Sequence, residues 1–214
     1  STHEAELAEG LARQTRLTRE VHHRVKNNLQ VIASLINLHA RGASAPDVAR
    51  AYASIQRRVD ALSVVHRNHF AELEENRGVE LRKLIGELAQ NLRASVPEGE
   101  HGPAITLDLA TCSVTQDVAV PVAFLLTELI ELAMSEDPRA RITVALRRVD
   151  TSQARLSISS AALAGSAALD TPQFDRFGRV IEGLSRQLRS PLHRDEKIGE
   201  YSLSLPTIGD ALSA

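Results

Sequence analysis

The chain has few of the residues that support disulfide, thiolate or aromatic chemistry. Its 214 residues include one cysteine, Cys112, no tryptophan and only 3% aromatic residues. A single cysteine excludes a disulfide framework within the chain and a thiolate metal cluster, and it suits a reducing compartment. We therefore expect a cytoplasmic protein whose core is built from aliphatic side chains.

A strong charge of one sign and a long apolar run are also missing. The formal net charge of −2 gives no reason to expect nucleic acid or an anionic membrane as a partner. No apolar run approaches the roughly 20 residues that span a bilayer, and no signal-peptide pattern opens the chain. No His, Cys, Asp and Glu set has metal-ligand spacing, and neither a Gly-rich phosphate loop nor a nucleophile elbow occurs.

Proline and glycine are scarce in the first forty residues, which permits a long helix. Between Ala5 and Ala40 there is no proline, and Gly10 is the one glycine. Apolar residues recur there every three or four positions, at Leu7, Leu11, Val21, Val25, Leu29, Ile32 and Ile36. This is the period of an amphipathic helix.

A second periodic run from Val48 to Phe70 follows a break at residues 41–44. Two long amphipathic helices joined by a short loop predict an antiparallel hairpin. One hairpin cannot bury both apolar stripes by itself. We therefore expect two chains to pair as a homodimer, with their hairpins forming a four-helix bundle.

Helical geometry places His23 on the exposed side of the first helix. At about 100° per residue, the apolar stripe lies roughly opposite His23. Glu20 and Asn27 share the face of His23, and Lys26 flanks it. From position alone, the simplest interpretation of His23 is a solvated surface residue.

The other histidines of the hairpin have different positions. His39 and His66 fall on apolar positions, where a buried structural histidine is the expected interpretation. His22 lies towards the edge of the stripe, and its role stays open.

The sequence around His23 resembles the phosphoacceptor helix of the HisKA_2/HWE sensor histidine kinases. Residues 20–29 read Glu-x-x-His-Arg-x-Lys-Asn-x-Leu and lead into an apolar helical run. Residues 56–66 show the Arg, apolar and His spacing of that family's second helix. The resemblance covers the first helix fully and the second well, and it implies that His23 is the phosphoacceptor.

The residue types near His23 suit phosphoryl transfer. A neutral imidazole is a good nucleophile, and the ordinary pKa of histidine, about 6.5, leaves the ring largely neutral at pH 7. We expect Glu20 to orient the ring and Asn27 to donate a hydrogen bond. Arg24 and Lys26 would offset the phosphate charge. For these two cations, a solvated charged face is an equally good interpretation.

The rest of the chain predicts an α/β domain. Helices are expected at 78–94, with a leading strand at 79–81, and at 118–134 and 174–188. Strands are expected at 104–109, 142–147, 154–159 and 200–205, with a loop at 97–103. This order predicts one mixed sheet covered by helices, and it resembles the GHKL ATP-binding domain of sensor kinases. The expected fold class is α + α/β: a helical hairpin domain at 1–76 and a degenerate GHKL-like α/β sandwich at 77–214.

Within that resemblance, the nucleotide-binding motifs are lost. The family has an Asn-Glu-Leu-x-x-Asn motif whose last Asn holds Mg²⁺, but residues 127–132 place Leu132 there, and leucine offers a cation no lone pair. An Asp-x-Gly-x-Gly loop is replaced by residues 157–165, with Ser160 at the Asp position. A later Gly-rich turn is reduced to residues 176–179. We therefore expect this chain to use no nucleotide or metal cofactor. The plain interpretation of this half is a packed domain without chemistry.

The resemblance implies a histidine phosphotransferase of a two-component phosphorelay. His23 would exchange a phosphoryl group with the Asp of response-regulator receiver domains, which would supply the Mg²⁺. The expected setting is the general stress response of alphaproteobacteria, with upstream histidine kinases reached through a receiver. Net dephosphorylation of a receiver is another direction. The alternatives are an active kinase with a divergent ATP site and a non-catalytic receiver-binding module.

Overall fold

The structure is a computed structural model that describes residues 2–42, 45–73, 78–96, 98–165, 178 and 182–209. Two long helices come first, α1 (Thr2–Gly42) and α2 (Pro46–Leu73). The following elements are β1 (Val79–Glu80), α3 (Leu81–Ala94), β2 (Ala104–Leu109), β3 (Ser113–Val114), α4 (Gln116–Glu136), β4 (Arg141–Arg148), β5 (Gln153–Ser159), a short 3₁₀ helix (Ala161–Leu163), β6 (His193–Asp195) and β7 (Glu200–Pro206). Residues 182–188 are also helical.

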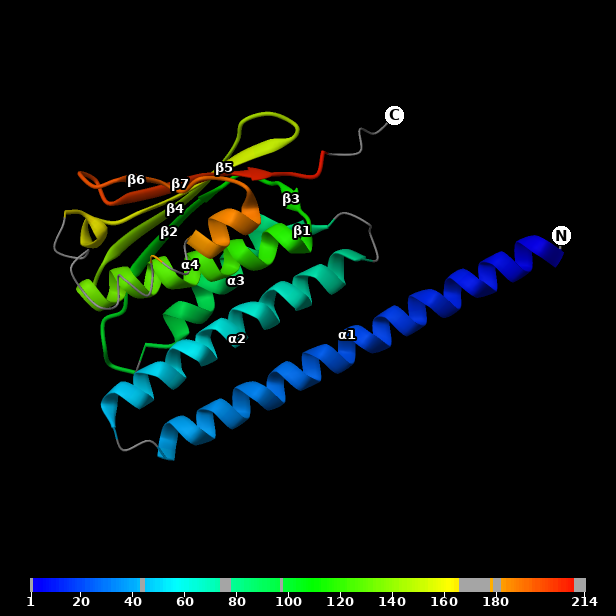
Figure 1. The fold of residues 1–214 in the computed structure, drawn as a ribbon, viewed down its shortest axis with the longest axis horizontal. Coiled ribbons are helices and arrows are strands. Elements are labelled where there is room, and N and C mark those ends of the chain that lie inside the picture. Colours follow the sequence, from blue (N-terminus) through cyan, green and yellow to red (C-terminus); the bar gives the residue numbers. More distant parts are fainter. Residues whose placement is uncertain are drawn as a thin grey trace.

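Helices α1 and α2 lie side by side as a hairpin, and the amino-terminal part of α1 extends beyond the end of α2 (Figure 1). The two predicted helices are confirmed, and α1 begins earlier than expected, at Thr2. At about 1.5 Å per residue, its 41 residues span roughly 60 Å. Leu29 of the stripe is buried against the rest of the chain, whereas Val21 and Val25 remain 58% and 37% exposed.

Helix α2 also packs against the α/β domain through a second face. Ala61, Val64 and Val65 are almost fully buried and join the same hydrophobic core as α3, α4 and the sheet. Figure 1 shows the resulting layers, with α2 between α1 and the helices that cover the sheet. The predicted boundary after residue 76 stays a prediction, but the core extends across it.

The described strands form a five-stranded sheet in the order β2-β4-β5-β7-β6 and a two-stranded pair of β1 with β3. β2 runs parallel to β4, and α4 connects them, as a parallel pair requires. The other neighbours in the larger sheet are antiparallel. Alternate residues of β4 and β5 are buried, so one face of the sheet is covered by helices.

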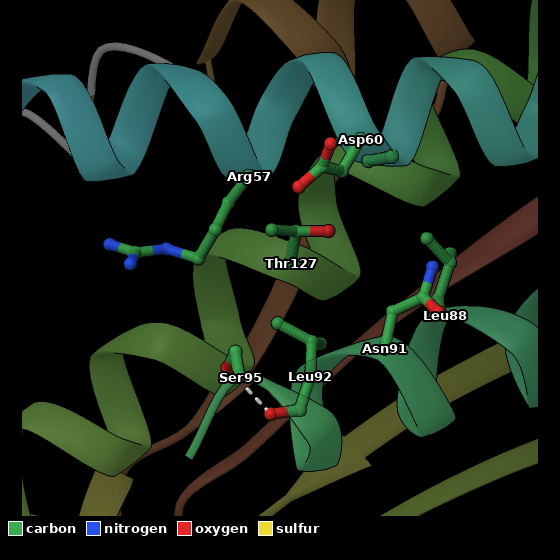
Figure 2. A pocket seen from close by; sticks show the side chains of 8 residues that line it. Arg57, Asp60, Leu88, Asn91, Leu92, Ser95 and Thr127 are labelled. Carbon is green, nitrogen blue, oxygen red and sulfur yellow. Dashed lines mark hydrogen bonds between the residues drawn. The ribbon is translucent and has the colours of Figure 1, made fainter. Parts of the chain in front are cut away.

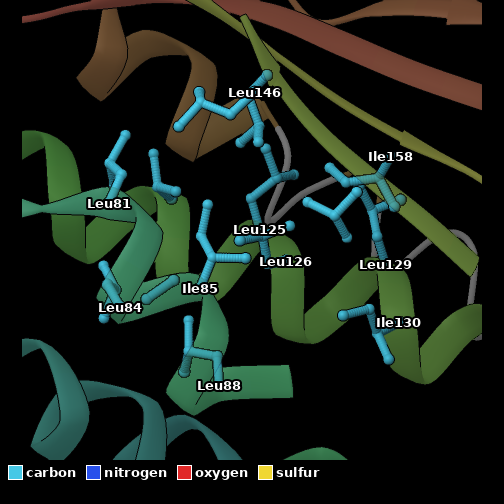
Figure 3. Close-up of a cluster of buried hydrophobic side chains, with 14 of the residues drawn as sticks. Leu81, Leu84, Ile85, Leu88, Leu125, Leu126, Leu129, Ile130, Leu146 and Ile158 are labelled. Atoms are coloured by element: carbon cyan, nitrogen blue, oxygen red, sulfur yellow. The ribbon is translucent and has the colours of Figure 1, made fainter. Parts of the chain in front are cut away.

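The core lies between this sheet face and helices α3 and α4 (Figure 3). In α3, Leu81, Leu84, Ile85 and Leu88 recur on one helical face and are buried. The carboxylate of Glu80 caps this helix, accepting hydrogen bonds from the backbone N–H groups of residues 82 and 83. α4 is buried on most sides, which explains its nearly continuous apolar sequence.

The predicted class, a helical hairpin followed by a mixed α/β domain, is confirmed. The longer strands match their expected ranges, and the leading strand ends at Glu80 because Leu81 already begins α3. β3 and β6 were not predicted, since two or three residues show no alternating pattern. Of the predicted helix at 174–188, the described residues 178 and 182–188 are helical.

Candidate functional site

His23 lies on the exposed side of α1, within a strip that also contains Glu20, Arg24 and Lys26. Glu20 and Lys26 each lie three residues from His23, and Arg24 lies four residues from Glu20, which are the spacings at which side chains on a helix are neighbours. The Glu20 carboxylate accepts a hydrogen bond from the Arg24 guanidinium at 2.7 Å. Both partners are more than half exposed, so this ion pair contributes at most a few tenths of a kcal/mol. We call residues 20, 23, 24 and 26 the His23 strip.

Two predicted roles near His23 stay predictions. The structure brings Glu20 to Arg24, and the expectation that Glu20 orients the His23 ring is not tested by this contact. Asn27 is helical, but its side chain lies outside the described residues.

His22 of α1, the residue next to His23, contacts His66 of α2. The His22 Nδ1 and His66 Nε2 atoms are 3.1 Å apart, and the ring centroids are 4.7 Å apart. His66 Nε2 is also 3.1 Å from the backbone carbonyl oxygen of His22. His66 is only 8% exposed, which confirms the expectation that it is buried.

These distances select one arrangement of protons on the two rings. A carbonyl oxygen can only accept, so His66 Nε2 must carry a hydrogen to bond the His22 oxygen. The same N–H then points between that oxygen and His22 Nδ1, which carries no proton and also accepts. This arrangement satisfies both contacts. If the proton were on His22 Nδ1 instead, the lone pair of His66 Nε2 would face a lone pair of the His22 carbonyl oxygen.

Helices α2 and α4 are joined by two ion pairs that the sequence analysis did not anticipate. Arg57 binds the Glu131 carboxylate, and Arg58 donates to Glu128 at 2.5 Å. The carboxylates are 15% and 12% exposed. Burial raises the pKa of Glu131 to about 7, outweighing the stabilising charge of Arg57, and Glu128 adds to the increase.

The two positions at which the family resemblance places nucleotide-binding residues, 132 and 160, are buried. Leu132 is 3% exposed and belongs to the hydrophobic core. Ser160 is 5% exposed, and its hydroxyl accepts from the Ala162 backbone N–H to cap the 3₁₀ helix. Within the described part of the chain, no group of three or more His, Cys, Asp or Glu could hold a metal ion. Of the turn at 176–179, Gly178 alone is among the described residues.

A small pocket of about 50 Å³ opens between α2, α3 and α4 (Figure 2). Burial raises the pKa of Asp60 at its edge. Three of its polar groups are already engaged: Arg57 with Glu131, and the hydroxyls of Thr127 and Ser95 with backbone carbonyls. No residue of α1 lines it, so the pocket is separate from the His23 strip. Its lining consists of Arg57, Asp60, Ala61, Leu88, Asn91, Leu92, Ser95 and Thr127.

A known protein family matches most of the helical hairpin. The family HisKA_2, described as histidine kinase, matches residues 20–96, which run from the His23 strip through α2 to the end of α3. Over this segment, which is about a third of the chain, the sequence is similar to the HisKA_2 histidine kinases.

Sequence relatives support the same family over a shorter range. The sensor histidine kinase PdtaS of Mycolicibacterium smegmatis is 48% identical over 48 residues, which is 22% of this chain and 10% of that protein. PdtaS of Mycobacterium tuberculosis has the same identity over the same length. This chain therefore matches about a tenth of the length of these relatives.

Solved structures extend the likeness to the whole fold. The blue-light activated histidine kinase of Erythrobacter litoralis EL346 superposes with a TM-score of 0.60 at 20% identity, covering 89% of this chain and 62% of that chain. Its histidine kinase domain gives 0.55 at 21% identity, covering 91% of each chain. At these identities the likeness concerns the fold alone, a helical hairpin followed by a mixed α/β domain.

The expectation that no apolar run approaches bilayer length is wrong for helix α4, which is long and apolar enough to cross a bilayer. Two thirds of its most apolar stretch is buried inside the protein, however, as expected of the central helix of a domain.

The His22–His66 contact was missed from the sequence, although a signal for it exists. In an antiparallel hairpin whose loop is centred near residue 44, positions 22 and 66 are equally far from the loop and therefore lie side by side. The ion pairs of Arg57 and Arg58 had no such signal, because their partners lie about 70 residues away in another element.

Proposed function

We propose that this chain is a histidine phosphotransferase that exchanges a phosphoryl group between His23 and the aspartate of a receiver domain, without using ATP. One contrast supports the proposal. His23 is exposed on α1, whereas Leu132, at the position of the family's Mg²⁺-binding Asn, is buried in the core.

The proposed transfer needs little from this chain beyond an accessible imidazole. A neutral ring nitrogen of His23 attacks the phosphorus of the receiver's aspartyl phosphate, so that a P–N bond forms while the P–O bond to the aspartate breaks. The aspartate leaves as a carboxylate, and the receiver's own Mg²⁺ would stabilise the transferring charge. Arg24 and Lys26 lie beside His23 and supply positive charge on this side. The reverse exchange, from phosphohistidine to a receiver aspartate, uses the same groups. Net dephosphorylation of a receiver would follow where water hydrolyses the P–N bond of phosphorylated His23 and releases inorganic phosphate.

The absence of ATP use is supported by the chemistry of two side chains. Leucine at 132 has no lone pair for Mg²⁺, and the Ser160 hydroxyl is already bonded to the Ala162 backbone. The residues at these positions do not fit a Mg²⁺–nucleotide site. We therefore propose that the chain carries no cofactor.

We further propose that the active form is a homodimer with a four-helix bundle. Apolar residues stay exposed along both helices of the hairpin, namely Leu7, Leu11, Leu17, Val21 and Val25 on α1 and Val48 and Ile55 on α2. A second copy would cover them by hydrophobic packing. Sedimentation equilibrium should give twice the mass of one chain, and a monomer at micromolar concentration would contradict the dimer.

The proposed setting is a cytoplasmic relay of the general stress response, in which an upstream histidine kinase reaches this chain through a receiver. Transfer rates measured against receivers from different responses would test this setting, which requires the fastest transfer with a stress-response receiver.

The experiment for the main proposal mixes the chain with a receiver carrying labelled aspartyl phosphate. Label should appear on the chain within minutes and should be lost in His23→Ala. His101→Ala is the matched control, because His101 is an exposed histidine in the α/β domain, and it should transfer normally. A stable complex without transfer would favour a receiver-binding module instead.

A further inference from the structure

His66 contacts the peptide unit that carries the phosphoacceptor. The carbonyl of His22 is bonded covalently to the backbone nitrogen of His23, and it accepts the His66 Nε2–H at 3.1 Å. The same N–H lies 3.1 Å from the ring nitrogen of His22. From the opposite helix, His66 therefore contacts two groups next to His23: the backbone carbonyl of His22 and the ring of His22.

This contact differs from ordinary packing between two helices. His66 is buried and donates from a ring that has little freedom to move, whereas His23 itself is exposed to solvent. A hydrogen bond from a fixed donor restrains the position and rotation of the helical turn it contacts. Phosphoryl transfer depends on in-line geometry, and misplacement by about 1 Å can cost on the order of a hundredfold in rate.

We infer that His66 is a positioning residue for phosphotransfer at His23, acting through the His22–His23 peptide and the His22 ring. The inference rests on the proposed function, because it names a residue that serves the same transfer. His66 touches neither the phosphate nor the receiver in this account. Its contribution is to present the His23 ring in one orientation.

The test uses two substitutions that differ in one hydrogen-bond donor. His66→Gln keeps an N–H near the position of Nε2, whereas His66→Leu fills similar space without a donor. Rates of transfer from a phosphorylated receiver are measured against receiver concentration. His66→Leu should lower the maximal rate about tenfold or more with little change in the receiver concentration at half-maximal rate, and His66→Gln should stay within about threefold of wild type. His101→Leu and His101→Gln serve as controls at an exposed position.

A second readout separates this inference from the proposed function. Hydrogen exchange at the backbone amides of residues 23–26 should become faster in His66→Leu than in wild type and recover in His66→Gln, whether or not a receiver is present. Absence of transfer in the wild-type chain defeats the proposed function, and the exchange rates still decide the positioning role. Equal transfer and equal exchange in all three chains overturn the inference. Equal losses of transfer rate in His66→Leu and His66→Gln overturn it as well, because they show that the fold needs the imidazole ring itself.

Discussion

Helices α1 and α4 present opposite surfaces. α1 exposes the His23 strip, which carries a histidine and positive charge. α4 buries Leu132 in the core, and its carboxylates, Glu128 and Glu131, bind arginines of α2. α1 thus keeps polar side chains accessible to a partner, whereas α4 serves mainly for packing.

Under the proposed function, the difference reflects how much each site requires of the fold. A phosphoacceptor needs one exposed side chain on a stable helix, and local sequence specifies that. A nucleotide site needs several separate segments to converge on one ligand, so substitutions such as those proposed at Leu132 and Ser160 would remove it without unfolding the domain.

The largest expected effect on stability comes from a substitution at Leu132. Replacing it with Asn, the residue that the family uses to bind Mg²⁺, puts an amide without hydrogen-bond partners into a closed apolar core. We expect Leu132→Asn to lower the free energy of unfolding by about 2–4 kcal/mol, measured by urea denaturation. The control change, Val149→Asn, starts from a residue that is 60% exposed and lies outside the proposed dimer interface, and it should cost under about 0.5 kcal/mol. Equal costs at the two positions would show that Leu132 is not packed as described.

The next effect is the dependence of stability on pH that Glu131 causes. Burial raises the pKa of Glu131 from 4.5 to about 7, so the folded chain binds a proton more tightly than the unfolded chain. This contribution to stability is fully present below about pH 4.5 and is lost as pH rises through 7, amounting to about 3 kcal/mol. Urea unfolding at pH 5 and pH 8 should show the decline in wild type and a smaller one in Glu131→Gln. Glu136→Gln, at an exposed position of the same helix, should keep the wild-type dependence.

A smaller effect distinguishes the ion pairs of the two helices. Double-mutant cycles with alanine should give a coupling energy of about 1 kcal/mol for Arg58 with Glu128, which is 12% exposed. The exposed pair of Arg24 with Glu20 should give under about 0.5 kcal/mol. A larger coupling for the α1 pair would reverse the comparison.

Much of the fold was predictable because its patterns are local. The apolar period of α1 and α2 predicts the hairpin, and the alternation in β4 and β5 predicts buried strands. The second buried face of α2 was not predicted. Ala61 and Val64 belong to the α/β core, and their packing partners lie in other elements. Only the fold brings those elements to α2.

The candidate site, like the fold, has a part that the sequence predicts and a part that it does not. The exposure of His23 follows from helical geometry, and local sequence was enough to place Glu20, Arg24 and Lys26 beside it. The contact of His66 with His22 depends on how the two helices are aligned, which their separate patterns do not specify.

The central claim is that phosphate reaches His23 from a receiver and not from ATP. Its most direct test incubates the wild-type chain and His23→Ala with γ-labelled ATP and Mg²⁺, beside a parallel reaction with labelled phospho-receiver. The account predicts label on wild type from the receiver alone and none on His23→Ala. Label from ATP that appears on wild type and disappears in His23→Ala would contradict it and make the chain an active kinase.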